Sequence, residues 1–102
     1  MVKVIIPPSV TSIGNCAFEG CTKLASFDLP SSVTSIGYRA FDGCTALLEL
    51  SLPPSVKTIW WRAFYDCNSL SKITVPSEVS VGEEAFPKTT KVVRYLPKHG
   101  NQ

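Results

Sequence analysis

Residues 32–47 read SVTSIGYRAFDGCTAL, and residues 9–24 read SVTSIGNCAFEGCTKL, which is the same pattern 23 positions earlier. A third version, SVKTIWWRAFYDCNSL, occupies residues 55–70. The positions that recur are Pro7, Pro30, Pro53 and Pro76; Ala17, Ala40 and Ala63; Phe18, Phe41 and Phe64; Cys21, Cys44 and Cys67; and Leu24, Leu47 and Leu70. A fixed period of roughly 20–50 residues is typical of a solenoid, in which each unit buries its apolar side chains only against its neighbours. The sequence therefore predicts a stack of near-identical coils.

The period divides the chain into four expected units, 4–26, 27–49, 50–72 and 73–94. We expect them to form a single domain over residues 1–97, and we expect a polar tail over residues 98–102. At 102 residues, the chain is long enough for one small domain.

The second unit shows which local structures to expect. Phe27 and Leu29 alternate with polar residues, as in a half-buried strand, and Pro30 ends that strand because proline cannot donate to a ladder. Residues 33–36 are rich in β-branched side chains and predict a second short extended segment. The spacing over residues 40–44 predicts a single helical or 3₁₀ turn with its apolar side chains inward. The expected class is therefore an α/β repeat with about four units.

The fourth unit departs from the pattern. Pro76 and Ala85 lie nine positions apart, one fewer than Pro53 and Ala63, so we place a deletion near residues 81–82. With this deletion counted, Thr89 replaces the recurring cysteine and Val92 replaces the recurring leucine. Terminal units of solenoids are often irregular, because they cap the stack.

Composition excludes several classes of function. The chain is 44% hydrophobic and 18% charged, and its net charge of +2 is too small and too scattered for a nucleic-acid or membrane footprint. No run of about 20 apolar residues could span a bilayer. His99 is the only histidine and no Cys-x-x-Cys spacing occurs, so we expect no metal and no cofactor. The acidic residues are spread over the units without a convergent nucleophile or base, and we expect no enzyme.

The Ile-Gly, Ala-Phe, Cys and Leu-Pro positions of these units resemble the leucine-rich repeats of the BspA type, also called the Treponema pallidum type, over almost the whole chain. The resemblance implies a right-handed leucine-rich-repeat solenoid with parallel strands and short helical or 3₁₀ turns. It also implies a cell-surface or secreted protein concerned with adhesion to host or matrix proteins, or with contact between cells. The family has no common catalytic residue. One departure from its pattern is Trp60, which stands where the repeat has glycine.

Binding in a solenoid is carried by the variable positions between the fixed ones. One group of variable positions precedes the Ala-Phe turn, and its members are side chains that often anchor protein interfaces. We take this group as the candidate protein-binding patch: Tyr38, Arg39, Trp60, Trp61, Arg62 and Tyr65. The alternative interpretation is structural, with the two tryptophans folded over the rim of the core and the two arginines stacked on them as cation–π pairs. A second candidate surface is the concave strand face, which carries Lys3, Ile5, Ser26, Asp28, Glu49, Ser51, Lys72 and Thr74.

Two functions remain open from the sequence. The first is a non-catalytic protein-interaction module, a fragment of a larger surface or secreted protein, with a host, matrix or cell-surface protein as partner. The second is a structural segment that self-assembles into homo-oligomers through uncapped ends, because an uncapped stack exposes apolar side chains and strand edges.

Overall fold

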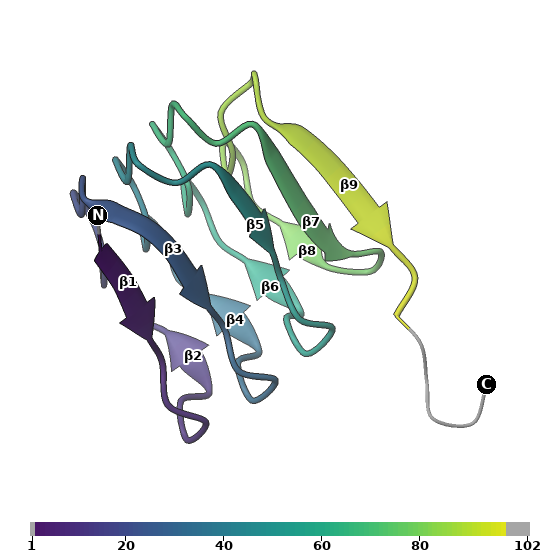
Figure 1. Cartoon of the computed structure of the whole chain (residues 1–102). Helices are drawn as coiled ribbons and strands as arrows, with labels where there is room; N and C mark the ends of the chain where they lie inside the picture. The colour runs from purple at the N-terminus through teal and green to yellow at the C-terminus, as the bar shows by residue number, and fades with distance from the viewer. Residues whose placement is uncertain (1, 98–102) are drawn as a thin grey trace.

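The computed structural model describes residues 2–97 as a stack of parallel coils (Figure 1). Each coil carries a longer strand on one face and a short strand on the other. The longer strands are β1 (Val2–Ile5), β3 (Leu24–Asp28), β5 (Glu49–Ser51), β7 (Lys72–Pro76) and β9 (Lys91–Tyr95). The short strands are β2 (Ser12–Ile13), β4 (Ser35–Ile36), β6 (Thr58–Ile59) and β8 (Ser80–Val81). The predicted parallel-strand solenoid of about four coils is confirmed, whereas the polar tail predicted over 98–102 lies outside the described residues.

The two faces differ in continuity. The short strands form one parallel sheet in the order β2-β4-β6-β8, while the longer strands form two, β1-β3 and β5-β7-β9. The break falls beside Phe27, which is paired with Val4 and occupies the position that Leu50 and Ile73 hold in later coils. The Phe27 ring lies flat against that of Phe41, with 4.4 Å between centroids. The sheet is thus interrupted where an aromatic ring replaces an aliphatic side chain.

The turns are the first feature in which the structure differs from the one expected from the sequence. The described residues contain no continuous helix; around residues 40–44 the chain forms only single turns, in which the amides of Asp42 and Cys44 donate to the carbonyls of Arg39 and Phe41 at 3.2 Å. Alternate amides of this turn donate to the next coil: Arg39 to Trp61 at 3.1 Å, Phe41 to Ala63 at 2.7 Å, and Gly43 to Tyr65 at 2.8 Å. Because these N–H groups point along the stack, they cannot bond within their own turn as a helix requires. The turns therefore form a third ladder between coils.

The end of the fourth coil is the second feature that differs from the expected structure. Ile59 pairs with Val81, 22 residues later, which agrees with the deletion placed near residues 81–82. Ile73, however, pairs with Val92, only 19 residues later, so the coil expected over 73–94 is shorter and the next strand already begins at Lys91. Val92 is consequently a strand residue with 40% of its surface exposed, and it does not fill the leucine column.

Thr89 is likewise exposed and does not fill the cysteine column. Its neighbour Thr90 is buried, and its hydroxyl donates to the Leu70 carbonyl at 2.8 Å.

The core consists of columns of like side chains. In the second and third coils Phe41, Phe64, Cys44 and Cys67 are fully buried. The phenylalanine rings stack with 5.1 Å between Phe18 and Phe41 and again between Phe41 and Phe64. Stacked coils thus bury the apolar groups that a single unit would leave in water, which is the main source of stability in such an array.

The two ends of the stack are built differently. At the first coil the same columns are only partly covered: Phe18 and Cys21 are half-buried and Ala17 is exposed. At the other end the Arg94 guanidinium donates to the carbonyls of Ser77 and Val79 at 3.0 and 3.3 Å.

Tyr95 strengthens this C-terminal end, because its hydroxyl donates to the Leu52 carbonyl at 2.7 Å. In the first coil the carbonyl of Val10 accepts a hydrogen bond from Ser32 of the following coil. Arg94 supplies the equivalent donor to Val79 at the last short-strand coil. Among the described residues, the last coil is thus held by these polar contacts, whereas the apolar columns are only partly covered at the first coil.

Candidate protein-binding surface

The six predicted residues lie on the turns that follow β4 and β6. Gly37 and Trp60 come directly after these strands, so Tyr38 and Trp61 occupy equivalent places one coil apart. Tyr38 is 45% exposed, Trp60 54% and Trp61 39%, while Arg39, Arg62 and Tyr65 are half-buried. We call this group, Tyr38, Arg39, Trp60, Trp61, Arg62 and Tyr65, the aromatic–arginine patch.

The backbone of the patch adopts an unusual conformation that repeats in every coil. Arg39 and Arg62 have φ angles of 53° and 54°, and their equivalents Cys16 and Glu84 have 60° and 57°. A positive φ costs an L-residue with a Cβ roughly 1–2 kcal/mol. The turn adopts it because the amides of Cys16, Arg39 and Arg62 then donate to the next coil, at 2.9–3.1 Å. The stack therefore fixes the direction in which both arginines leave the backbone.

Both arginines contact the rings of the patch. The Arg62 guanidinium carbon lies 4.6 Å from the Trp61 ring centroid and 4.1 Å from that of Tyr65, and the Arg39 carbon lies 5.3 Å from Trp61. These distances are within cation–π range. The arginine contacts are those of the structural interpretation, but they leave Trp60 mostly in solvent. The rings and guanidinium groups are held in place while part of their surface remains accessible.

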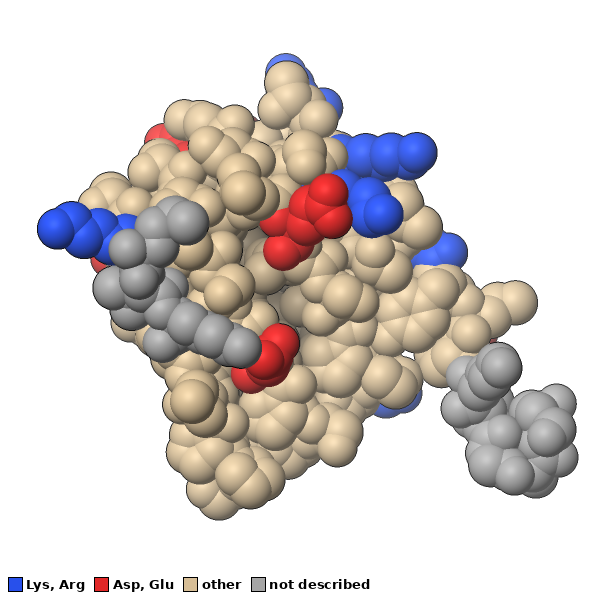
Figure 2. Space-filling view, viewed as in Figure 1, with Lys and Arg blue, Asp and Glu red and all other residues tan. Residues whose placement is uncertain are grey.

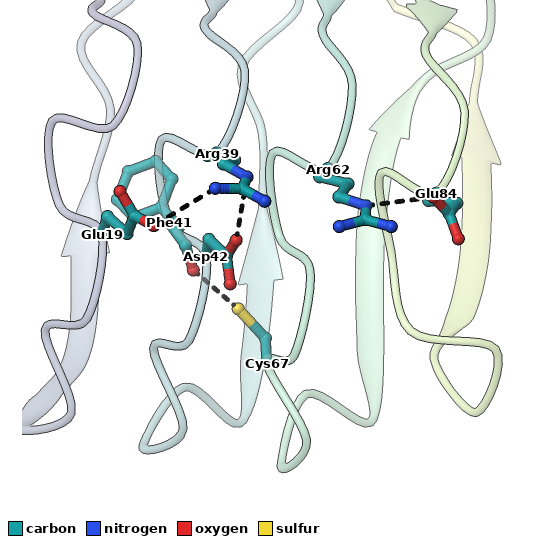
Figure 3. A network of polar contacts seen from close by, with 7 residues as sticks. All are labelled: Glu19, Arg39, Phe41, Asp42, Arg62, Cys67 and Glu84. Atoms are coloured by element: carbon teal, nitrogen blue, oxygen red, sulfur yellow. Dashed lines mark hydrogen bonds and ion pairs between the residues drawn. The ribbon is translucent and has the colours of Figure 1, made fainter.

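The two arginines lie in neighbouring coils, with Glu19 on one side of them and Glu84 on the other, and Asp42 lies beside Arg39 (Figure 3). Arg62 Nε donates to Glu84 Oε1 at 3.0 Å, whereas Arg39 Nη1 lies 3.9 Å from Glu19 Oε2. Arg39 Nε is 3.6 Å from Asp42 Oδ2, too far for a hydrogen bond, and this nitrogen has no hydrogen-bond partner among the described residues. Pairs this exposed contribute little stability, about 0–1 kcal/mol. Their effect is to balance the positive charge of the patch.

The acidic partners were missed by the sequence analysis, although the register contained the signal. Glu19 and Asp42 occupy one column, and Tyr65 takes that column in the third coil. Partial burial raises the pKa of Asp42, and the nearby Arg39 charge opposes this shift. Glu84 continues the arginine column into the fourth coil, and Glu19 and Asp42 lie three positions after that column, so aligning the units would have predicted these pairs.

Trp60 occupies a column that otherwise holds glycine. A Cβ on Gly82 would lie 2.7 Å from the Trp61 nitrogen and 2.9 Å from the Trp60 carbonyl carbon, which is closer than real contacts allow. The hydrogen bond from the Trp60 amide to the Ile36 carbonyl is 3.0 Å long. The corresponding hydrogen bonds from the amides of Gly37 and Gly82 are 2.8 and 2.7 Å long. The hydrogen bond between coils is thus kept at Trp60, while 54% of the tryptophan is exposed.

The concave strand face carries a different distribution of charge. Glu49 on β5 is paired in register with Lys72 on β7, and Lys72 with Lys91 on β9. In Figure 2 most of the blue surface gathers on the side of β9, while red lies nearer the middle of the face. This face therefore becomes more basic toward the C-terminal end.

In the part of the chain that the structure describes, no helix is long and apolar enough to cross a membrane. Within residues 2–97, no group of three His, Cys, Asp or Glu side chains is placed to hold a metal ion.

Comparison with known proteins agrees with this architecture. The model of the BspA type leucine-rich repeat region matches residues 1–97, in six copies. No curated protein matches the chain.

Several solved structures are similar. A leucine-rich repeat protein of Bacteroides ovatus shares 40% identity with a TM-score of 0.80, and the match covers 91% of this chain and 25% of that one. The leucine-rich repeat protein of T. pallidum shares 31% identity with a TM-score of 0.76, over 89% of this chain and 50% of that one. A leucine-rich cell surface protein of Faecalibacterium prausnitzii shares 29% identity with a TM-score of 0.65, over 94% and 32%. The chain thus spans about half the length of the T. pallidum protein.

The family model covers nearly every residue, and the coils of the structure follow the same period. The chain belongs to the BspA-type leucine-rich repeat family.

Proposed function

We propose that the chain is a non-catalytic protein-interaction module of a larger cell-surface or secreted adhesion protein, and that the aromatic–arginine patch contacts its partner. The observation that carries the proposal is the exposure of Tyr38, Trp60 and Trp61 beside two oriented arginines. Large aromatic side chains and arginine dominate binding energy at protein interfaces. The surface location is supported by the similar F. prausnitzii protein, which is described as a leucine-rich cell surface protein.

The proposal is tested with an array of purified extracellular matrix proteins. We expect the wild-type chain to bind at least one of them. The double variant Trp60→Ser, Trp61→Ser should lose that binding by tenfold or more, because each anchor residue of an interface is worth about 2 kcal/mol or more. Glu78→Gln is the matched control, since Glu78 is exposed on a corner away from the patch. Circular dichroism and urea unfolding verify that each variant is folded.

Two outcomes would overturn the assignment. Binding that survives loss of both tryptophans excludes the patch as the contact surface. Binding that is instead lost in Lys72→Glu assigns recognition to the concave strand face.

A second function is favoured by a separate observation, the partly covered apolar side chains of the first coil. Val4, Ile6 and Val10 are only half-buried, and two apolar hollows of about 310 and 300 Å³ share Val4 and Phe18 in their walls. We propose that two copies associate through their first coils, because apolar surface left exposed favours association. The last coil is more polar at the equivalent place, since Arg94 donates to the carbonyls of Ser77 and Val79.

Sedimentation across a concentration series tests self-association. We expect a dimer whose fraction increases with concentration, and Val10→Glu should return it to monomer by placing a charge in the contact. A wild-type chain that stays monomeric at millimolar concentration contradicts this second function.

A further inference from the structure

A hollow between the third and fourth coils arises from the shortened fourth coil. Ala63 and Ala85 are equivalent positions. The Ala63 carbonyl accepts a hydrogen bond from the Phe41 amide, and the Ala85 carbonyl accepts the corresponding one from the Phe64 amide. Lys72 and Lys91 are paired in register. The chain thus takes nine positions from Ala63 to Lys72 and six from Ala85 to Lys91. The third turn is consequently left partly uncovered, and a hollow of about 630 Å³ opens over it.

The ladder between the turns stops at this hollow. Gly20 donates its amide to Asp42 at 2.7 Å, and Gly43 donates to Tyr65 at 2.8 Å. Asp66 is the next member of this column, but among the described residues its N–H makes no equivalent bond. The carbonyl of Pro87, which would be its partner, accepts from Thr90 at 3.0 Å instead. One backbone donor therefore faces the fourth coil without the carbonyl that earlier coils provide.

The hollow is lined by aromatic rings and charged side chains. Of its two carboxylates, Glu84 is already paired with Arg62 at 3.0 Å, while Asp66 has no ion-pair partner among the described residues. Two of the lining residues are aromatic, Tyr65 and Phe86, and the charged ones are Asp66, Glu84 and Lys88. Asp66 stands at a φ of 59°, where Gly20 and Gly43 supply the same turn without a side chain. The carboxylate is thus an addition to the repeat, placed on the rim where the ladder ends.

We infer that this hollow binds an arginine or lysine side chain carried on an extended segment of the protein partner. A backbone carbonyl of the partner accepts from the Asp66 N–H, in the place of the missing coil carbonyl. The cationic side chain bonds to the Asp66 carboxylate and lies against the Phe86 ring, since aromatic rings and carboxylates together favour a cation. The Tyr65 ring already carries the Arg62 guanidinium, whose carbon lies 4.1 Å from its centroid. A peptide is favoured over a glycan because the empty place is that of a peptide carbonyl.

The inference rests on the proposed function and names the chemistry of its partner. The probe is the peptide acetyl-Gly-Arg-Gly-amide, followed by amide chemical shifts of the ¹⁵N-labelled chain. Its matched control replaces arginine with citrulline, which keeps the shape and removes the charge. We expect the arginine peptide to shift the amides of residues 65–68 and 84–89 and to bind about tenfold more tightly than the citrulline peptide.

The decisive variant is Asp66→Gly, which introduces the residue that the first two coils already use at this position. It removes the carboxylate without straining the turn, so its unfolding midpoint in urea should equal or exceed that of the wild type. We expect its affinity for the arginine peptide to fall about tenfold, because it loses a charged hydrogen bond. Glu49→Gln, on the concave strand face, should leave affinity unchanged.

Several outcomes overturn the inference. They are equal binding of the two peptides, unchanged affinity in Asp66→Gly, an equal loss in Glu49→Gln, or occupation of the same amides by chitotriose in preference to the arginine peptide. Failure here is distinguishable from failure of the proposed function. A matrix protein that binds through Trp60 and Trp61 while the peptide does not bind refutes only the hollow. Peptide binding without any captured matrix protein refutes only the adhesion role.

Discussion

At the scale of the residue, the glycine column shows how stacking imposes identity on single positions. A Cβ on Gly37 would lie 2.7 Å from the backbone nitrogen of Asn15 in the preceding coil, whereas a Cβ on Gly14 would meet nothing within 4 Å. The two glycines occupy the same position of successive units, and neither requires a positive φ. The difference between them is the presence of a coil beneath Gly37.

We therefore expect Gly37→Ala to destabilise the chain by about 1–3 kcal/mol, the usual cost of forcing extra atoms into a packed site. Gly14→Ala should be neutral or slightly stabilising, because alanine restricts the unfolded chain and has room in the folded one. Urea unfolding measures both. Equal effects of the two changes would show that close approach between coils is not the reason for this column.

The buried thiols of Cys44 and Cys67 hold their protons more tightly than exposed thiols do. Burial raises the pKa of Cys44 to about 11 and that of Cys67 to about 12. Each thiol also donates to a carbonyl of the preceding coil: Cys67 to Phe41 at 3.0 Å (Figure 3), and Cys44 to Phe18 at 3.2 Å.

A raised pKa means that the folded state holds the proton more tightly than the unfolded state does. The stability from neutral burial is therefore complete below the unfolded pKa of about 8.5–9 and is lost as pH rises toward 11–12. We expect urea midpoints to decrease between pH 8 and pH 10.5, and to decrease less steeply in Cys67→Ala. Parallel slopes for the two proteins would contradict the assignment to this thiol.

At the scale of the element, a unit gains its stability from having a neighbour on both sides. Phe41 lies between the rings of Phe18 and Phe64 and is fully buried, while Phe18 has a coil on one side only and is half-buried. The same side chain in the same turn therefore has two environments, which makes the pair a matched comparison.

We expect Phe41→Ala to cost about 3–5 kcal/mol, since it removes a buried ring and leaves a cavity. Phe18→Ala should cost less than half as much, because water already reaches one side of the ring. Chemical denaturation with a common m-value gives both changes in free energy. A similar cost at both positions would mean that the end coil is covered in solution, as it would be in the proposed dimer.

At the scale of the whole molecule, the unequal ends predict unequal local stability. Arrays of coils open from their ends, and opening at an end breaks contacts with one neighbour only. The amides of Phe18, Phe41 and Phe64 each donate to the next coil at 2.7 Å, so hydrogen-bond length does not distinguish them.

Hydrogen exchange should therefore report the difference in packing alone. We expect the Phe18 amide to exchange at least about tenfold faster than the Phe41 and Phe64 amides in dilute solution. Equal protection of all three would indicate a single cooperative unit instead of an array that opens from its first coil. Protection of Phe18 that increases with protein concentration would support the N-terminal contact between copies.

The family, the parallel solenoid and the buried columns could be predicted from the sequence, because a period of 23 residues repeats the same local chemistry and only stacking can bury it. The six residues of the patch could also be named, since the fixed register marks which positions vary. The ladder of turn amides could not be predicted, because a spacing typical of a helical turn leaves open whether its N–H groups bond within the coil or to the next one. The early start of β9, the hollow over Asp66 and the break between β3 and β5 depend on how unequal coils fit together in space. Those features exist only between units, where distances depend on neighbours that the order of residues within one unit does not specify.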